Sequence, residues 1–261
     1  MSESQKIIKY FALGLAFMII FSIISIFFNV IESLFFDSND SLKDKSEYKL
    51  EYNNVVGLDI EIKNGKFSII SGNEFKIITN IKKLKNYSEG GILNIKDESS
   101  SFNSKELTLV VPDIVYNEVS IELEAVKANI ESIKTNKFDM DMGAGNVILD
   151  SIVVNNEADI ETGAGKLTIN DSVITNLDLD MGAGKTVING VLKGNTYFDM
   201  RVGSLIVNLS DTLDNYKFIV DKGIGSIKLN DNSLSDNTTV GSGVNTIKID
   251  GGIGKLSIAT K

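Results

Sequence analysis

The segment DLDMGAGKTVING, Asp178 to Gly190, contains the Gly-Lys-Thr that ends a phosphate-binding loop. Such a loop also needs a glycine five residues before this Gly-Lys-Thr, so that consecutive backbone N–H groups surround the phosphates. Leu179 holds that position, and Val187 stands where the dinucleotide-binding fingerprint needs its third glycine. No helical pattern follows either partial match, so the sequence predicts no nucleotide binding.

Carboxylates are the second group of residues whose spacing could support chemistry. Hard oxygen ligands suit Ca²⁺ or Mg²⁺, so one hypothesis is a face that binds divalent cations or a cationic partner. The other interpretation is a solvated wall whose charge is partly offset by Lys127, Lys166 and Lys185. The calcium-binding G-G-x-G-x-D repeat does not match, because Leu256 occupies its Asp position. The longer series is Glu122, Asp141, Glu161, Asp180, Asp199 and Asp221, and a shorter series two positions earlier is Asp139, Asp159 and Asp178.

The residue types that are missing exclude several classes of function. The 261-residue chain has no Cys and no His, and its formal net charge is −9. Thiol catalysis, disulfide bonds, a Ser-His-Asp triad and imidazole metal ligands are therefore excluded. Residues 31–261 carry −10, because Glu3, Lys6 and Lys9 contribute +1 before them, and this acidity disfavours nucleic acid as a partner. The sequence assigns no catalytic, cofactor-binding or metal-ligating residue, and it predicts a protein that is not an enzyme.

A repeat of about twenty residues must position these side chains. Counted from a glycine-rich turn, aliphatic residues recur six positions later, aliphatic residues and Thr186 recur four positions later, and apolar residues recur three positions earlier, with polar residues between them. This period-two alternation predicts β-strands with one buried face, and stacked copies would bury those faces together. The sequence therefore predicts an all-β, single-stranded β-solenoid (β-helix) of about 20-residue coils. The residues taken as the start of the turn are Glu124, Gly143, Gly163, Gly182, Arg201, Gly223 and Gly243.

The glycines at these turns are expected to form corners, where neighbouring coils approach closely and positive φ is needed. A column seven residues after the turn is expected to be a structural corner of stacked amides. Met140, Met142, Met181 and Met200 fall in inward columns and are expected to fill the core. About three more coils are expected between Gly65 and Glu124, and GGIGKLSIATK is expected to close the C-terminal end as a half coil with Lys255 and Lys261 as edge charges. The corner column is Glu131, Asp150, Asn170, Asn189, Asn208, Asn230 and Asp250.

The N-terminal region has a different composition. Residues 10–30 are 21 residues without a charge, which is long enough to cross a bilayer as a helix. Lys6 and Lys9 precede this segment and acidic residues follow it, so the positive-inside rule predicts a cytoplasmic N-terminus. The predicted organisation is a cytoplasmic segment at 1–9, an uncleaved transmembrane helix at 10–30, a linker at 31–49 and an extracellular β-solenoid domain at 50–261.

Residues 50–258 resemble the bacterial putative-adhesin family of unknown function, also called toastrack domains. The resemblance rests on VVGLDIEIKNGKFSII at 55–70, LTLVVPDIVYNEVSIELEAVKANI at 107–130 with its Val111-Pro112, and the serial GAGKLTI-type coils. It implies a β-solenoid on the outside of the cell, tethered by a transmembrane helix, with adhesion or envelope-stress roles. It implies no catalytic residues.

The function expected from the sequence is a membrane-tethered module for adhesion or binding, for scaffolding, or for sensing cell-envelope stress. Its expected partners are the membrane and either another envelope protein or a surface polysaccharide, with no nucleotide and no nucleic acid. The alternative is a carbohydrate-active enzyme, because some β-helices carry paired carboxylates on one wall. The absence of Trp and the scarcity of aromatic residues on the outward columns disfavour that alternative.

Overall fold

The computed structural model describes residues 45–52, 54–99 and 105–261, all within one compact unit, Ser41–Lys261. This part of the chain is all-β, as predicted, and contains one short 3₁₀ turn, η1 (Leu213–Asn215). It holds no helix that is long and apolar enough to cross a membrane. The predicted transmembrane helix at 10–30 lies outside the described residues, as do its N-terminal flank and most of the predicted linker.

The strands form a single sheet. Its long strands are β2 (Gly57–Gly72), β7 (Val115–Glu131), β8 (Lys134–Asp150), β9 (Val153–Thr175), β10 (Leu177–Lys193), β11 (Asn195–Leu209) and β16 (Asn245–Ala259). Shorter strands are β1 (Ser46–Lys49), β3 (Lys76–Thr79), β4 (Leu84–Glu89), β5 (Ile92–Asp97), β6 (Glu106–Pro112), β12 (Tyr216–Asp221), β13 (Ile224–Leu229), β14 (Asn232–Ser233) and β15 (Thr238–Val240).

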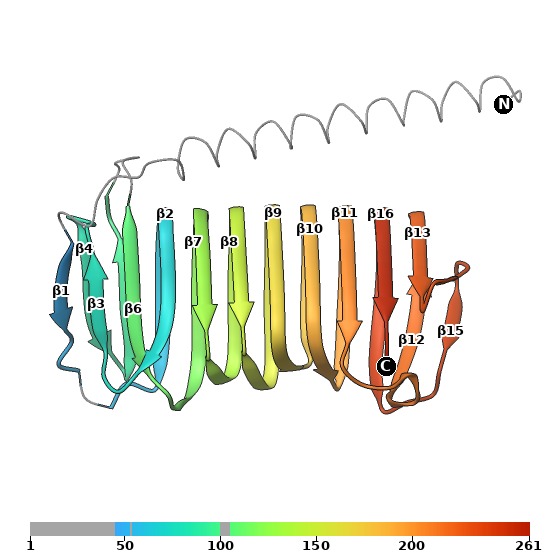
Figure 1. Ribbon diagram of the computed structural model, residues 1–261, viewed down its shortest axis with the longest axis horizontal. Coiled ribbons are helices and arrows are strands. Elements are labelled where there is room, and N and C mark those ends of the chain that lie inside the picture. Colours follow the sequence, from blue (N-terminus) through green and yellow to red (C-terminus); the bar gives the residue numbers. More distant parts are fainter. Residues whose placement is uncertain (1–44, 53, 100–104) are drawn as a thin grey trace, which may run out of the picture. The chain divides into compact units, whose positions relative to one another are not determined.

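Each long strand contributes one coil of a solenoid and pairs in parallel with its neighbours in the stack, which are long strands except beyond β2 and beyond β16 (Figure 1). The register matches the predicted columns, since Ile121 pairs with Met140, Met140 with Ile160 and Ile160 with Leu179. Parallel strands with no hairpin between them can bury one face only by stacking coil on coil. The predicted stacking of about twenty-residue coils is therefore confirmed from β7 to β11.

The core is a set of aliphatic and aromatic columns inside the coils. The residues six positions after the turn from Ile130 to Leu229 are all buried, and so are the four predicted methionines. Tyr116, Phe138, Phe198 and Tyr216 are among the largest fully buried side chains. Full burial of one large apolar side chain contributes about 1.5–3 kcal/mol to stability. Because the neighbouring coils provide much of this burial, the stability of each coil depends on both of its neighbours.

Close approach of the backbone explains the glycine corners. A Cβ on Gly163 would lie 2.3 Å from the carbonyl oxygen of Gly143, and one on Gly182 would lie 2.4 Å from that of Gly163. In several of these turns positive φ belongs instead to the second glycine, with φ of 149° at Gly145 and 156° at Gly165, whereas in the turn of β13 it belongs to the first, Gly223, with φ of 59°. The first glycine therefore gives space to the neighbouring coil, while the second also permits a backbone conformation that other residues avoid.

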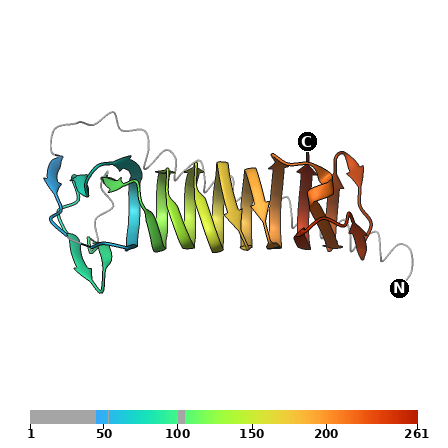
Figure 2. The ribbon, with the colours of Figure 1, turned by 90° about the horizontal axis from the view of Figure 1, so that it is seen from below.

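The C-terminal end differs from the prediction. β16 does not follow β12 and β13 as a final half coil but lies between them and β11 (Figures 1 and 2). Its corner is Gly252, because Ile253 pairs with Val202 and Ile224. The assignment of a corner to Gly243 was therefore wrong. Lys255 lies within the stack rather than on an edge. After β11 the chain first forms β12 and β13 and then returns as β16, which occupies the position between them and β11.

The N-terminal end contains fewer coils than predicted. Only one coil lies beyond β2, and it is made of two pieces, since β5 and β6 both pair in parallel with β2. The antiparallel strands β3 and β1 extend beyond β6, and β4 forms a hairpin with β5 through Gly90 and Gly91. The prediction of three coils between Gly65 and Glu124 was wrong, because turn residues alone do not distinguish a hairpin from a further coil.

Candidate functional site

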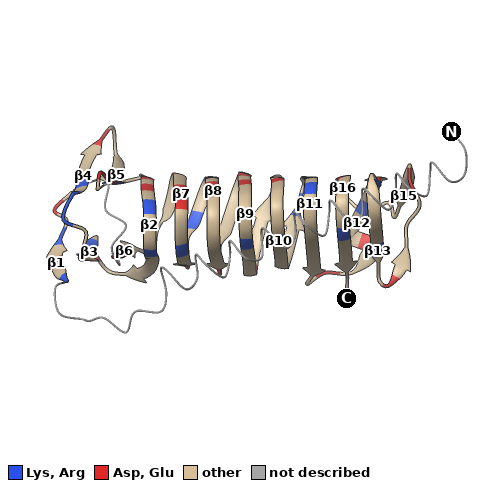
Figure 3. Ribbon diagram, turned by 90° about the horizontal axis from the view of Figure 1, so that it is seen from above, with Lys and Arg blue, Asp and Glu red and all other residues tan. Residues whose placement is uncertain are grey.

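The glycine corner divides each coil into two straight segments. We call the outward surface of the segments before the corner the acidic wall, and that of the segments after it the lysine wall. Side chains alternate along a strand, so a given position on every coil forms a column that runs along the stack. Neighbouring members of a column are about 4.8 Å apart. Charged residues recur at matching positions on successive strands when the stack is viewed from above (Figure 3).

Eight carboxylates lie in register along the acidic wall, one on each of eight neighbouring coils. The six members predicted from the sequence are confirmed in this register. Glu61 pairs with Glu122, and Asp250 lies between Asp199 and Asp221. The sequence alignment placed Asp250 in the amide column, which was wrong because the corner of its coil is Gly252. This first acidic column is Glu61, Glu122, Asp141, Glu161, Asp180, Asp199, Asp250 and Asp221.

The second acidic column lies two residues farther from the corner. Asp139, Asp159 and Asp178 occupy adjacent coils β8, β9 and β10, and Asp59 belongs to the same column on β2. Partial desolvation raises the pKa of Asp159 and of Asp178, and repulsion from neighbouring carboxylates adds to the rise. The two columns therefore act together as a dense region of negative charge.

Lysines on the acidic wall lie mostly toward its ends. Lys96 lies 2.5 Å from Glu61 and 3.4 Å from Asp59 at the N-terminal end. Lys137 lies 3.8 Å from Glu118 and 3.6 Å from Glu157, and Lys248 lies over the Tyr197 ring at 5.3 Å near the C-terminal end. Near the centre of the wall, Lys137 of β8 acts to lower the pKa of Asp159, but partial desolvation and the neighbouring carboxylates outweigh it.

The lysine wall carries hydrogen-bond donors at one column, three residues after the start of the corner. The sequence identified three of its lysines, and the register adds Lys66 and Lys255. On the same eight coils, every member of this column has a side-chain donor. The donor column is Lys66, Lys127, Asn146, Lys166, Lys185, Ser204, Lys255 and Ser226.

The amide column is structural, as predicted for its asparagines. Asn189 donates to Asn170 at 2.9 Å, and Asn208 donates to Asn189 at 2.7 Å. The left-handed conformation belongs mostly to the following residue, with φ of 57° at Ser151 and 46° at Asp171. Side-chain amides therefore bond along the stack while the next residue makes the turn, which leaves this column without a free set of ligands.

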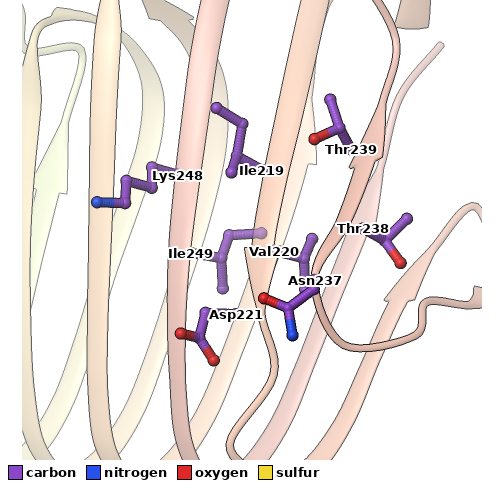
Figure 4. A pocket seen from close by; sticks show the side chains of 8 residues that line it. All are labelled: Ile219, Val220, Asp221, Asn237, Thr238, Thr239, Lys248 and Ile249. Carbon is purple, nitrogen blue, oxygen red and sulfur yellow. The ribbon is translucent and has the colours of Figure 1, made fainter.

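Two hollows lie toward the ends of the acidic wall. The C-terminal hollow has a volume of about 260 Å³, and Asp221, Asn237, Thr238 and Lys248 are among the residues that line it (Figure 4). The N-terminal hollow, of about 480 Å³, lies beside the β4–β5 hairpin. Within the described residues, no three or more carboxylates gather closely enough to hold a metal ion. The wall thus offers carboxylates along an extended surface rather than around one point.

A buried ion pair lies outside the acidic wall, near the N-terminal end. Lys105 Nζ is 2.8 Å from a carboxylate oxygen of Asp97, and the two side chains are 6% and 0% exposed. Burial favours the protonated acid, but hydrogen bonds from Lys105 and from the Ser99 hydroxyl and N–H outweigh it and lower the pKa of Asp97. This pair joins β5 to the start of β6 across Gly65, where a Cβ would lie 2.5 Å from the Lys105 carbonyl oxygen.

No family model and no curated protein matches the chain in sequence. Among solved structures, similarity is found to a putative cell adhesion protein from Clostridium sporogenes, with 18% identity, 83% of this chain and 99% of that chain covered, and a TM-score of 0.39. A putative adhesin from Parabacteroides distasonis matches with 12% identity, coverage of 83% and 97%, and a TM-score of 0.48. A putative adhesin from Bacteroides fragilis matches with 11% identity, the same coverages and a TM-score of 0.43. These identities and scores are low, so no partner or activity is transferred from these proteins.

Proposed function

We propose that the protein is a membrane-tethered, extracellular β-solenoid that acts as a non-enzymatic adhesion or binding module of the cell envelope. The acidic wall is its binding surface, and the second acidic column holds a cationic partner, for which the natural candidates are an amine-bearing surface polysaccharide and a basic envelope protein. Scaffolding and envelope-stress sensing are roles that such a module would perform through the same surface.

The observation that supports this proposal most directly is the register of the two acidic columns. Unit charges about 4.8 Å apart repel by about 0.9 kcal/mol per neighbouring pair even in water. Solubility alone would be served by carboxylates scattered over the surface, without this repulsion. A linear cationic partner laid along the second acidic column would meet one carboxylate on each of the adjacent strands β8, β9 and β10 and relieve the repulsion between them.

The tether is supported by the sequence. The uncharged segment at 10–30 has the length of a membrane span, and Lys6 and Lys9 before it favour a cytoplasmic N-terminus. The β-solenoid would then lie outside the cell, where surface polymers and the walls of other cells are accessible.

Binding to beads that carry a partly deacetylated, amine-bearing β-linked glucosamine polymer tests the proposal, with the fully acetylated neutral polymer as the reference. The full-length chain in detergent should be retained on the cationic polymer and released by salt. Asp139→Asn, Asp159→Asn and Asp178→Asn together should weaken retention about tenfold, since each exposed ion pair contributes about 0.2–1 kcal/mol.

A matched control removes three carboxylates elsewhere, by Asp150→Asn, Asp171→Asn and Asp231→Asn, and should be retained like the wild type. Equal retention of both triple variants would refute the second acidic column as the binding surface. Release of soluble sugar from either polymer would instead support the carbohydrate-active alternative.

A further inference from the structure

An apolar ridge runs along the glycine corners, between the acidic wall and the lysine wall. It consists of the middle residue of each turn, in register on seven coils, and its members are half-buried or exposed, with Ile224 59% exposed. A contiguous apolar strip at the surface, with polar residues on both sides, marks a candidate interaction surface. The ridge residues are Ala125, Ala144, Ala164, Ala183, Val202, Ile253 and Ile224.

The ridge is flanked by complementary groups on every coil. The first acidic column lies three residues before it, and the donor column lies two residues after it. A coil such as β9 therefore presents Glu161, Ala164 and Lys166 in that order across the corner, and β10 presents Asp180, Ala183 and Lys185. The eight acceptors match the eight donors coil by coil. An apolar centre between complementary polar margins is the pattern of a protein–protein interface.

We propose that the partner of this corner is a second copy of the chain, bound in a parallel, two-fold symmetric dimer. A two-fold rotation about an axis parallel to the stack brings ridge against ridge. The same rotation places the first acidic column of each copy opposite the donor column of the other, at the same coil. Glu161 of one copy then faces Lys166 of the other, and both copies make the same contact, as a two-fold interface requires.

Charge selects this arrangement over the antiparallel one. Turning one copy end over end also brings the ridges together, but it places acidic column against acidic column and donor column against donor column. Like charges at such spacings repel by about 1 kcal/mol per pair in water. The parallel arrangement also leaves residue 45 of both copies at the same end of the dimer, which suits two chains that emerge from one membrane.

The size of the surface predicts a weak dimer. Seven steps of about 4.8 Å give a strip about 34 Å long, and the five residue steps from one column to the other span about 16 Å. The strip thus measures at most about 550 Å² on each copy, because its two margins lie on walls that meet at the corner, and this is below the roughly 800 Å² per partner of a standard interface. We therefore expect reversible association in solution that is strengthened when two chains share a membrane. The dimer does not require the proposed binding surface, because the second acidic column stays outside the strip, and only its strengthening on a membrane rests on the proposed tether.

Single cysteines test the geometry in the full-length chain, which has no cysteine of its own. Ala125→Cys and Ala183→Cys should each form a disulfide-linked dimer under mild oxidation, because each residue faces its own copy across the two-fold axis. Lys193→Cys, at an exposed position away from the corner, is the control. Both corner variants should cross-link at least tenfold faster than the control in detergent or native membrane. Equal rates at the three positions would overturn the proposal, and cross-linking of Ala183→Cys without Ala125→Cys would overturn the parallel arrangement.

Charge reversal tests the complementarity. Glu161→Lys with Asp180→Lys, and separately Lys166→Glu with Lys185→Glu, should each weaken association at least tenfold as measured by sedimentation at low salt. An equal mixture of the two variants should associate again, because each reversed column then faces an opposite charge in the partner. This recovery also shows that both variants are folded. A mixture that stays monomeric, or a dimer that survives both reversals, would overturn the proposal.

Discussion

Substitution of Gly163 by alanine tests whether close stacking of the corners holds the coils together. The added Cβ would lie 2.3 Å from the Gly143 carbonyl oxygen and 3.2 Å from that of Met142. Ordinary contact requires at least 3.4 Å, so β8 and β9 must separate by about 1 Å at this corner. Overpacking of a well-packed site typically costs about 1–3 kcal/mol, and here the obstacle is backbone held in a sheet. We expect a cost of about 3 kcal/mol, which lowers Tm by about 6–12 °C for a domain of this size.

Gly90→Ala is the matched control. Gly90 has φ of +60° but nothing within 4 Å of an added Cβ, so this substitution costs only the left-handed penalty of about 1–2 kcal/mol. Gly163 is not in the left-handed region, so the two variants separate steric exclusion from backbone conformation. Thermal unfolding of residues 45–261, followed by circular dichroism, measures both. If Gly163→Ala melts as high as Gly90→Ala, the close-approach explanation of the corners is incorrect.

Three further predictions concern stability. Asp178→Asn should raise Tm at pH 7, because the raised pKa of Asp178 means that its charged form destabilises the fold. The gain in Tm should shrink as pH falls through the folded pKa and vanish below the unfolded value of about 3.9. A gain that is constant with pH would contradict this. Lys105→Met should cost about 3–5 kcal/mol by leaving the Asp97 carboxylate buried without its partner, and denaturant unfolding should show most of this loss recovered by adding Asp97→Leu. Asn189→Ala should cost about 1–2 kcal/mol, because it removes two hydrogen bonds of the amide column; a change in Tm below 1 °C would show that the amides are solvated instead.

The periodic part of the fold could be predicted because its signal is local and repeated. Ile160, Leu179 and Phe198 occupy the same place in successive repeats, and alternation at this period permits only an inward column. The close approach at Gly143 and Gly163 was also predictable, because glycine at a fixed turn position leaves room for a neighbouring backbone. The carboxylates from Glu122 to Asp199 followed from the same alignment.

The ends of the stack could not be predicted in this way. β16 and the β12–β13 pair carry the same apolar pattern and the same Gly-Ile-Gly turn, so either could lie next to β11. Counting from Gly243 instead of Gly252 still placed Ile249 in a buried position, because one inward column was exchanged for another. That error placed Asp250 outside the first acidic column, so the sequence did not show how many coils this column spans.

The sequence by itself determined the period, the inward columns and the corner glycines, because each follows from side chains within one coil and its repetition. Only the tertiary structure decided which coil lies beside which, and hence that Glu61, Asp250 and Lys255 join columns whose other members lie far away in sequence. The physical reason is that parallel coils with similar apolar faces exchange places at little cost in burial. Their order is therefore set by the connecting loops and by pairing across the whole stack, which no local pattern records.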